Sequence, residues 1–394
     1  MRYAAFMKLV FQFGSHPALS QAELVSRFPN LAHGRLLAER FFVVECSESP
    51  AWLMGQLGGV VKILEVVEGL SRKPDELVAH LADHVIRANT ARNKVTFGVS
   101  IVNASEFKGL GIALKREIQA QTDRPVRSVI SRDPILSSAS VQLEKLLPPD
   151  GVDLTILKDS SDVVACQTVA VQPFDEWSFR DYGRPGRDAK RGMLPPKLAK
   201  IMINLAQGAM ESSSSAVYDP FCGSGTVLTE AALMNFGRVF GSDILKQAVD
   251  DTKASLAWAR TQFGLDATEF DVFKHDASAR AQHLKPASID FVASEPFLGR
   301  PLKKGEALSA SEKNALVALY NKTLRALAPA MKQDCRLVFS LPFQITPREL
   351  LPLHEIIAET GFTIDPLLPE QKTLLYMRSD QRTGRQIVRL VRNA

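Results

Sequence analysis

The sequence predicts an α/β protein in which a C-terminal doubly wound parallel sheet is preceded by two smaller α+β units. From residue 216 onward, short apolar runs alternate with amphipathic helical stretches, which is typical of a parallel sheet with crossover helices. A glycine-rich turn follows the first of these runs, where a ligand-binding loop is expected. Before residue 176, strand-like and helix-like segments occur in two groups of their own.

Residues 1–70 form the first predicted unit. The stretch YAAFMKLVFQF, residues 3–13, has the apolar content of a buried strand, and Ser20 can cap a helix that begins near Gln21. The remaining segments of this unit are two strands, at 40–46 and 60–70, and a helical segment at 51–59. We expect these elements to pack into a compact α+β layer.

Residues 71–175 form the second predicted unit. It opens on KPDELVAHLADHVIRAN, whose apolar positions recur at helical spacing. The segments that follow are predicted as a strand, a helix and a strand, at 94–103, 109–121 and 126–131. The unit ends in two apolar runs, 152–159 and 161–172, which predict a hairpin that turns at Asp159–Ser161.

A basic and aromatic segment, 176–194, separates these units from the last domain. Aromatic side chains lie among its cations, which are Arg180, Arg184, Arg187, Lys190 and Arg191. Glycine and proline are frequent here, so we expect the segment to begin as a loop. One interpretation is a solvated linker. Another is an RNA-contacting segment, because cations neutralise phosphates and aromatic rings stack on bases. The two interpretations are compatible.

Residues 195–394 form the last predicted domain. Pro195 and Pro196 suit the first turn of a helix that continues to residue 207. Strands are predicted in 216–221, 238–244, 267–277, 288–297 and 335–343, and helices in 226–235, 246–264 and 311–332. Residues 373–393 have the pattern of two strands around a turn, which would add an antiparallel hairpin at the sheet edge.

The composition excludes several other classes of protein. A net charge of +5 permits an anionic partner without requiring one. The four cysteines, Cys46, Cys166, Cys222 and Cys335, form no CxxC pair, so we expect neither a metal site nor a disulfide scaffold. No apolar run approaches the roughly 18 residues of a membrane span, and the N-terminus lacks a cleavage-site pattern. We therefore expect a cytoplasmic protein with no membrane or metal partner.

The stretch YDPFCGSGTVLTEAAL, residues 218–233, carries the strongest ligand-binding signal. A strand ends near Asp219, a glycine turn follows, and Leu228 stands where a dinucleotide-binding turn has its third glycine. A carboxylate before the turn would repel a pyrophosphate but attract the ammonium and sulfonium of S-adenosylmethionine. We therefore predict that this cofactor binds here, although a purely structural turn is the alternative. The predicted contacts are Asp219, Phe221, Cys222, Gly223, Gly225 and Thr226.

Two further carboxylates follow the next two predicted strands. Asp243 ends the strand after the glycine turn, at a spacing that suits hydrogen bonds from ribose hydroxyls, and Ile244 lies beside it. Asp276, with Ala277, follows the third strand and is placed to accept from the adenine amino group. Alternatively, Asp243 caps the next helix and Asp276 is an ordinary loop residue. Aspartates at three successive strand ends indicate a nucleoside cofactor more strongly than any one alone.

The stretch ASEPF ends the fourth predicted strand, so it should face the methyl group of that cofactor. Methyl transfer to an amino nitrogen requires acceptors that hold the amino group and an aromatic face that stacks the base. A carboxylate, a proline and an aromatic ring occur together in the tetrapeptide Ser294, Glu295, Pro296 and Phe297. Lys303 and Lys304 follow closely, as candidate phosphate contacts or as solvated cations.

The tetrapeptide fits the Asp-Pro-Pro-Tyr or Asn-Pro-Pro-Tyr motif of nucleic-acid amino-methyltransferases in two registers. In the first, Ser294 takes the acidic place and Phe297 keeps the aromatic place. In the second, Glu295 keeps the carboxylate and the aromatic ring moves by one residue. We favour the first register because Phe297 then retains its stacking role while Glu295 supplies negative charge.

These motifs resemble those of the THUMP-containing tRNA guanosine-N2 methyltransferases, which modify guanosine-10 in archaea and eukaryotes and carry a UPF0020-like RNA methylase domain. DPFCGSGTVLTEAAL is similar to the cofactor loop of that family, and RDYGRPGRDAKRGMLPPKLAKIMINLA to the segment before it. Over residues 175–300 the resemblance rests on specific motifs. Over residues 1–170 it rests on the order of the predicted domains. It implies a ferredoxin-like domain at 1–70, a THUMP domain at 71–175 and a Rossmann-like methyltransferase domain at 195–394.

The resemblance implies S-adenosylmethionine as methyl donor, tRNA or another structured RNA as acceptor, and methylation of the guanine 2-amino group. The THUMP domain would bind the acceptor end of tRNA mainly by shape and backbone. Eukaryotic members act with a small activator subunit, so a protein partner is left open. Because Ser-Glu-Pro-Phe departs from the family motif, two alternatives are kept. One is methylation of rRNA guanine or another base amino group, and the other is an RNA-binding pseudo-enzyme that retains the cofactor fold.

Overall fold

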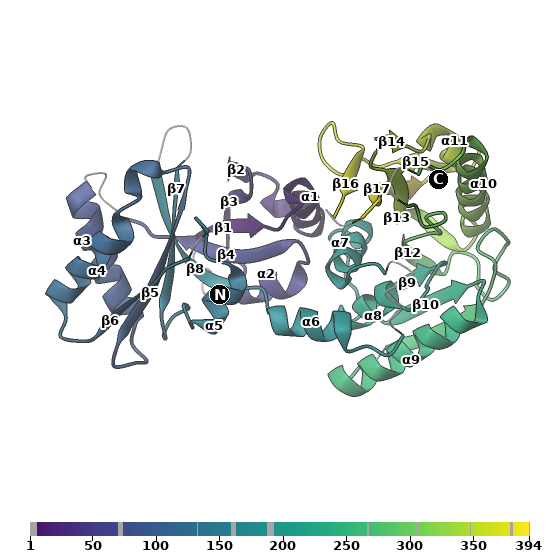
Figure 1. The fold of residues 1–394 in the computed structure, drawn as a ribbon. Coiled ribbons are helices and arrows are strands. Elements are labelled where there is room, and N and C mark those ends of the chain that lie inside the picture. Colours follow the sequence, from purple (N-terminus) through teal and green to yellow (C-terminus); the bar gives the residue numbers. More distant parts are fainter. Residues whose placement is uncertain are drawn as a thin grey trace. The chain divides into compact units, whose positions relative to one another are not determined.

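The computed structural model describes residues 6–69, 74–131, 133–158, 163–186, 193–265, 268–303, 306–346, 348–378 and 381–393 of the chain. The chain divides into two compact units, each built on one β-sheet (Figure 1). Unit 1 comprises Met1–Pro17 and Asn30–Phe174, and unit 2 comprises Ala18–Pro29 and Asp175–Ala394. In the part of the chain described, no helix is long and apolar enough to span a bilayer.

A single eight-stranded sheet of mixed orientation runs through unit 1, in the order β2-β3-β1-β4-β8-β7-β5-β6. Its strands are β1 (Met7–Phe13), β2 (Arg35–Ala38), β3 (Phe41–Cys46), β4 (Val60–Val66), β5 (Val95–Val102), β6 (Val126–Val129), β7 (Val152–Lys158) and β8 (Val163–Val171). Strand β5 is parallel to β6 and β7, whereas β4 pairs antiparallel with β8. The segments expected as separate units at 1–70 and 71–175 therefore share one sheet.

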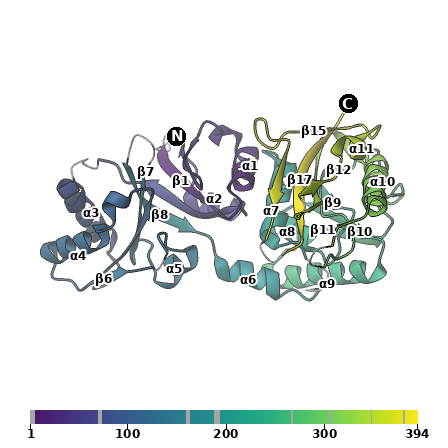
Figure 2. The same cartoon turned by 45° about the horizontal axis from the view of Figure 1, so that its top comes forward.

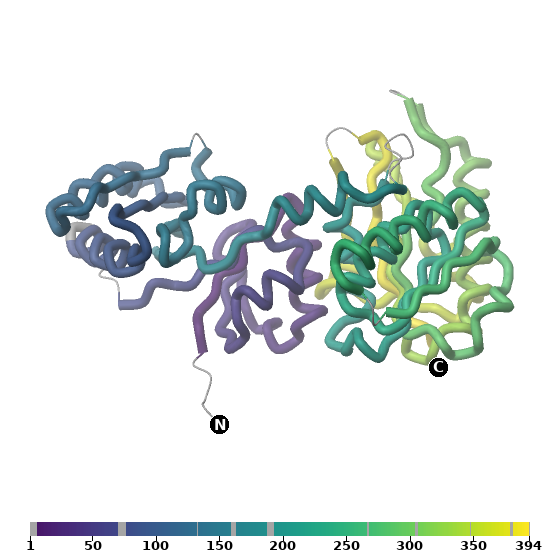
Figure 3. The backbone as a smooth tube through the Cα atoms, turned by 90° about the horizontal axis from the view of Figure 1, so that it is seen from below, coloured from purple at the N-terminus to yellow at the C-terminus, as the bar shows by residue number. Residues whose placement is uncertain are grey.

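Two amphipathic helices, α3 (Pro74–Ala88) and α4 (Leu110–Gln121), lie side by side against this sheet (Figure 1 and Figure 3). Leu81 of α3 and Leu114 of α4 share a core with Phe97 of β5, because the apolar positions of each helix recur on one face. The shorter helices of the N-terminal part are α2 (Pro50–Gln56), α5 (Ser138–Leu143) and the 3-10 helices η1 (Pro29–Leu31) and η2 (Ser105–Phe107). The predicted hairpin of β7 and β8 is confirmed, and its turn at 159–161 lies outside the described residues.

Unit 2 contains a nine-stranded sheet with the path β11-β10-β9-β12-β13-β17-β15, to which β14 and β16 are added. The strands are β9 (Ala216–Asp219), β10 (Arg238–Asp243), β11 (Glu269–Lys274), β12 (Ile289–Ser294), β13 (Met331–Gln344), β14 (Glu349–Leu350), β15 (Phe362–Ile364), β16 (Thr373–Tyr376) and β17 (Thr383–Arg392). Strands β9 to β13 are parallel, and β17 is antiparallel to β13 and β16. The predicted doubly wound parallel sheet and its antiparallel hairpin are confirmed, and β17 lies inside the sheet rather than at its edge.

Helices cover both faces of this sheet, as Figure 2 shows for α7 and α10. One face carries α1 (Pro17–Arg27), α7 (Pro196–Gln207), α8 (Thr226–Leu233) and α9 (Lys246–Phe263), and the other carries α10 (Ala310–Leu327) and α11 (Leu353–Ile357). Strand β12 alternates between them, since Phe291 joins the first core and Val292 the second. The strand order reverses between β9 and β12, and ligands of such sheets bind outside the strand ends at that point.

Two local predictions are corrected. The first helix begins at Pro17 rather than near Gln21, so Ser20 is a buried helix residue and not a cap. This helix belongs to unit 2, where Asn204 Nδ2 donates to Glu23 Oε1 at 2.7 Å. The segment from Trp177 begins as helix α6 (Phe174–Tyr182) rather than as a loop. Acidic residues in its first turn favour a helix there because they interact with the positive end of the helix dipole.

A buried ion pair and a threonine hydroxyl connect three strands of unit 1. Lys62 Nζ on β4 donates to Asp153 Oδ2 on β7 at 2.8 Å, and both side chains are fully buried. Thr168 Oγ1 on β8 donates to the same oxygen at 2.6 Å. A buried pair of this kind fixes the register of its neighbours, because a shift would leave a charge without its partner.

We predict that Lys62→Met lowers the free energy of unfolding of unit 1 by about 3–5 kcal/mol, since the Asp153 carboxylate would lose its counter-charge. Urea unfolding, followed by hydrogen exchange of peptides from β4 and β7, measures the loss. The double variant Lys62→Met/Asp153→Leu is the control and should regain most of the stability. A single variant as stable as the parent would contradict the prediction.

Candidate functional site

The site begins where two neighbouring strands end at the point of strand-order reversal. Asp219 is the last residue of β9 and Ser294 the last residue of β12, so their side chains meet at the same sheet edge. Ser294 Oγ donates to Asp219 Oδ1 at 2.5 Å, and Phe221 N donates to the same oxygen at 3.0 Å. Both side chains are buried. Asp219 is therefore held in one orientation by groups that are themselves fixed.

Burial raises the pKa of Asp219 to about 7, because the ionised form loses its hydration. The hydrogen bonds from Ser294 and Phe221 act in the opposite direction, and the negative charges of Asp243 and Glu295 raise the pKa further. Among the described residues, none forms an ion pair with Asp219. A cation entering the pocket would stabilise the ionised carboxylate by Coulomb attraction.

The glycine turn after β9 places its backbone against α9. Gly223 and Gly225 have φ angles of 54° and 85°, which favour glycine. A Cβ at Gly225 would lie 3.1 Å from Thr252 Cγ2, so this residue also has to be small. Thr252 Oγ1 donates to Gly223 O at 2.9 Å, and Ser255 Oγ donates to Ser224 O at 3.0 Å. The turn is consequently held against α9, while Gly223 lines the pocket and a Cβ there would meet only Phe221 O, at 3.9 Å.

A pocket opens between this turn and the end of β12. Of the predicted site residues, the structure brings Asp219, Phe221, Cys222, Gly223, Thr226 and Glu295 to its wall. The other residues of the wall were not predicted as site residues from the sequence. They are Gly186, Met193, Leu194, Ser224, Val227 and Asp251. Asp251 comes from the first part of α9, and no sequence motif indicates that it turns toward the glycine loop. Met193 and Leu194 lie in the segment that resembles the one before the family's cofactor loop.

The residues predicted to hold a nucleoside lie outside the wall of this pocket. Asp243 accepts from Gly223 N at 3.1 Å and from Leu245 N at 3.0 Å, so it braces the glycine turn. Ile244 is exposed. Asp276 is also exposed, and its pKa is lowered by hydrogen bonds from the backbone and hydroxyl of Ser278. Ala277 is buried behind it.

The predicted Ser-Glu-Pro-Phe tetrapeptide divides into buried and exposed members. Ser294 and Pro296 are buried, and Glu295 lines the pocket while pairing with Arg385 of β17. Phe297 is 58% exposed, and its carbonyl oxygen accepts from the hydroxyl of Tyr320 at 2.5 Å. A large aromatic ring held at the surface by its own backbone is suited to stack on an incoming base.

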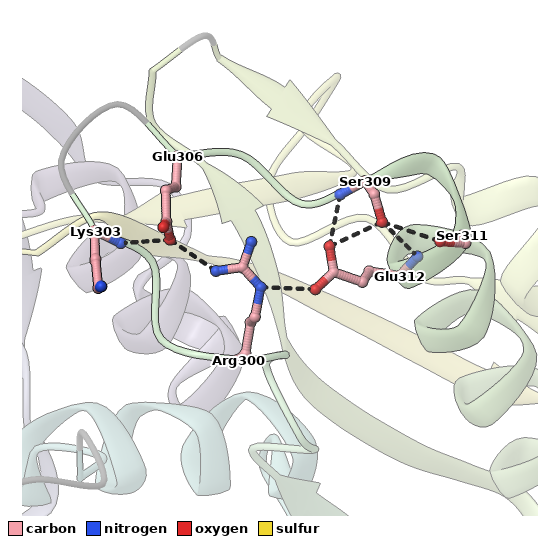
Figure 4. Close-up of polar contacts among 6 residues, drawn as sticks. All are labelled: Arg300, Lys303, Glu306, Ser309, Ser311 and Glu312. Atoms are coloured by element: carbon pink, nitrogen blue, oxygen red, sulfur yellow. Dashed lines mark hydrogen bonds and ion pairs between the residues drawn. The ribbon is translucent and has the colours of Figure 1, made fainter.

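The chain after Phe297 is organised around Arg300 (Figure 4). Its Nη1 donates to Glu306 Oε2 at 2.7 Å and its Nε donates to Glu312 Oε1 at 2.8 Å. Glu306 also accepts from Lys303 N at 3.0 Å, and Glu312 forms a capping box with Ser309 at the start of α10. Because these pairs are exposed, each contributes little stability by itself, but together they tie this loop to α10. Lys303 is exposed, and Lys304 lies outside the described residues.

Two of the predicted RNA contacts are corrected. Arg180 and Arg184 are buried, and Arg180 Nη1 donates to Glu230 Oε2 at 2.8 Å. The Arg180 guanidinium also lies 3.8 Å from the ring centroid of Trp177, because helix α6 places both side chains on one side. Arg180 thus links α6 to α8, and neither arginine is open to phosphate. Arg187, Lys190 and Arg191 lie outside the described residues.

Residues 184–358 match the UPF0020 family model, which describes an RMKL-like methyltransferase domain. Two similar relatives are named tRNA (guanine(10)-N2)-dimethyltransferase. The protein of Methanothermobacter thermautotrophicus is 38% identical over 108 residues, which cover 27% of this chain and 28% of the relative. The protein of Pyrococcus abyssi is 29% identical over 145 residues, which cover 36% and 39%. The matched part thus spans less than half the length of either relative.

A solved structure resembles the chain along nearly its whole length. TrmN from Thermus thermophilus superposes with a TM-score of 0.57 at 16% sequence identity, over 98% of this chain and 99% of that chain. At this identity the likeness concerns the fold. It supports a mixed α/β architecture with two sheets of mixed strand orientation.

We predict that the Asp219 carboxyl group of the free protein titrates near pH 7 in a carbon-13 NMR experiment. Ser294→Ala should raise this pKa further, because the carboxylate loses a hydrogen-bond donor. Asp243→Asn should lower it, because a nearby negative charge is removed. Titration near the ordinary aspartate value of 3.8 would show that the carboxyl group is hydrated rather than buried.

Proposed function

We propose that this protein, whose residues 184–358 match the model of an RMKL-like methyltransferase domain, transfers the methyl group of S-adenosylmethionine to the 2-amino group of a guanosine in tRNA. The observation that carries the proposal is the buried Asp219 carboxylate beside a glycine turn, within one pocket with Glu295. The two relatives named for guanine-N2 methylation of tRNA support the choice of substrate.

The pocket fits the amino-acid end of the cofactor. Asp219 has an ionisable oxygen pair at the wall and no cationic partner among the described residues, so an ammonium or sulfonium complements it. Gly223 leaves room for close approach. Asp243 and Ile244 would then contact the ribose, and Asp276 and Ala277 the adenine. When bound, S-adenosylmethionine supplies an electrophilic methyl group on sulfur and leaves as S-adenosylhomocysteine.

The chain's contribution to methyl transfer is mainly placement. Phe297 would stack on the extruded guanine, and acceptors at 294–296 would hold its amino group so that the nitrogen lone pair points at the methyl carbon. The N–C bond forms as the C–S bond breaks, the electron pair stays on sulfur, and one amino proton passes to solvent. No strong general base is needed, because orientation and electrostatic stabilisation supply most of the rate increase.

Unit 1 is proposed to bind the tRNA through a ferredoxin-like domain within 1–70 and a THUMP domain within 71–175. Lys108, Lys115 and Arg116 are exposed on or beside α4, where they are available to phosphates. Lys303 of unit 2 is proposed as a further phosphate contact. A small activator subunit is compatible with this arrangement.

Two substitutions should separate cofactor binding from methyl transfer. We predict that Asp219→Ala abolishes S-adenosylmethionine binding in titration calorimetry, because the cation loses the buried carboxylate beside the glycine turn. Phe297→Ala should leave the cofactor dissociation constant within about threefold but lower turnover by about 10-fold or more, since stacking contributes about 1–3 kcal/mol per base. Loss of cofactor binding in Phe297→Ala would contradict this division of roles.

The proposed reaction is tested by incubating the protein with unmodified tRNA and labelled S-adenosylmethionine, followed by nucleoside mass spectrometry. We expect N2-methylguanosine, or its dimethylated form, in the tRNA. Cofactor binding without incorporation would indicate a pseudo-enzyme, and label in another nucleoside would show that a different base is the target. Either result would refute the proposed function.

A further inference from the structure

The Glu295 carboxylate is held by three donors from two other strands. Arg385 of β17 donates through Nε to Oε2 and through Nη2 to Oε1, the latter at 3.2 Å. Ser340 of β13 donates through Oγ to Oε2 at 3.2 Å. An arginine fork bound to both oxygens fixes the plane of the carboxylate as well as its position. Glu295 therefore enters the pocket wall in a defined orientation.

Arg385 is buried, and each of its guanidinium nitrogens donates a hydrogen bond. Its side chain is 2% exposed, and its remaining terminal nitrogen Nη1 donates to Gln381 Oε1 at 3.0 Å. A buried guanidinium requires an anionic partner, because the cost of removing its charge from water is several kcal/mol. Glu295 is the anionic partner that Arg385 contacts, and it lies in the same pocket wall as Asp219.

One acceptor site of Glu295 remains open. A carboxylate offers about four lone pairs, and the three donors found among the described residues leave one on Oε1. Ser294 differs, because it is fully buried and its hydroxyl already donates to Asp219. Of the two residues that can take the acidic place of the motif, Glu295 is thus the one with a free acceptor at the pocket wall.

We propose that Arg385 is a positioning residue for methyl transfer, which orients the ionised Glu295 carboxylate so that Oε1 accepts a hydrogen bond from the exocyclic amino group of the target base. The inference rests on the proposed function and adds a specificity to it. A base with an exocyclic amino group fits this acceptor, whereas a base that presents only carbonyl oxygens would be repelled.

The test compares Arg385→Lys with Arg389→Lys in tRNA methylation. Both arginines are buried on β17, but Arg385 pairs with Glu295 of the pocket wall, whereas Arg389 pairs with Asp365, which is not in that wall. Lysine keeps the charge and loses the fork. We expect Arg385→Lys to lower kcat by about 10- to 100-fold, since small misplacements at a reacting centre have effects of this size. The cofactor Kd and the KM for tRNA should stay within about threefold, and Arg389→Lys should keep kcat within about twofold of the parent.

A double variant separates positioning from stability. Arg385→Gln leaves Glu295 without its counter-charge and should lower Tm, whereas Glu295→Gln/Arg385→Gln should regain Tm because neither charge remains. We expect kcat of the double variant to stay low, because the amide can present its NH₂ group in place of the acceptor.

Equal kcat in Arg385→Lys and Arg389→Lys, or full kcat in the double variant, would overturn the inference alone. A parent protein that methylates no tRNA would refute the proposed function and this inference with it.

Discussion

The site depends on a carboxylate that is buried before any cation arrives. Asp219 ends a short parallel strand between two others, so the backbone fixes its position at the pocket wall. Ser294 and Phe221 hold one oxygen, and burial favours the neutral acid in the free protein. A cationic cofactor would reverse that preference. The strand order and the glycine turn place the Asp219 carboxyl group, and the neighbouring carboxylates raise its pKa.

A second carboxylate, Glu295, lies in the same pocket and has different partners. It is paired with the buried Arg385, whereas Asp219 has hydrogen bonds but no ion pair among the described residues. The negative charge of Glu295 contributes to the raised pKa of Asp219, because like charges in one pocket disfavour ionisation. Of these two carboxyl groups, Asp219 is the one available to a cation, and Glu295, paired with Arg385, is the one proposed to face the base.

Local sequence patterns predicted much of this site. The features that were not predicted depend on pairs of residues that are far apart in the sequence. The alternating pattern predicted the parallel sheet, and Asp219, Gly223 and Gly225 were recognisable because a strand end and a tight turn leave marks in adjacent residues. The Glu295–Arg385 pair was not predictable, since its members are far apart in sequence, one just after β12 and the other on β17. The burial of Arg180 was missed for the same reason, because its partner Glu230 lies on another helix.

The central claim, that a buried and largely neutral Asp219 becomes ionised when the cofactor binds, is tested most directly by proton release. Titration calorimetry with S-adenosylmethionine at pH 6, in two buffers of different ionisation enthalpy, counts the protons exchanged on binding. At this pH the cofactor's α-amino group is already protonated, so the account predicts release of close to one proton. It also predicts weaker binding below pH 7 than above it, because the neutral acid attracts the cation less. Binding at pH 6 with no proton release, or with proton uptake, would contradict the account.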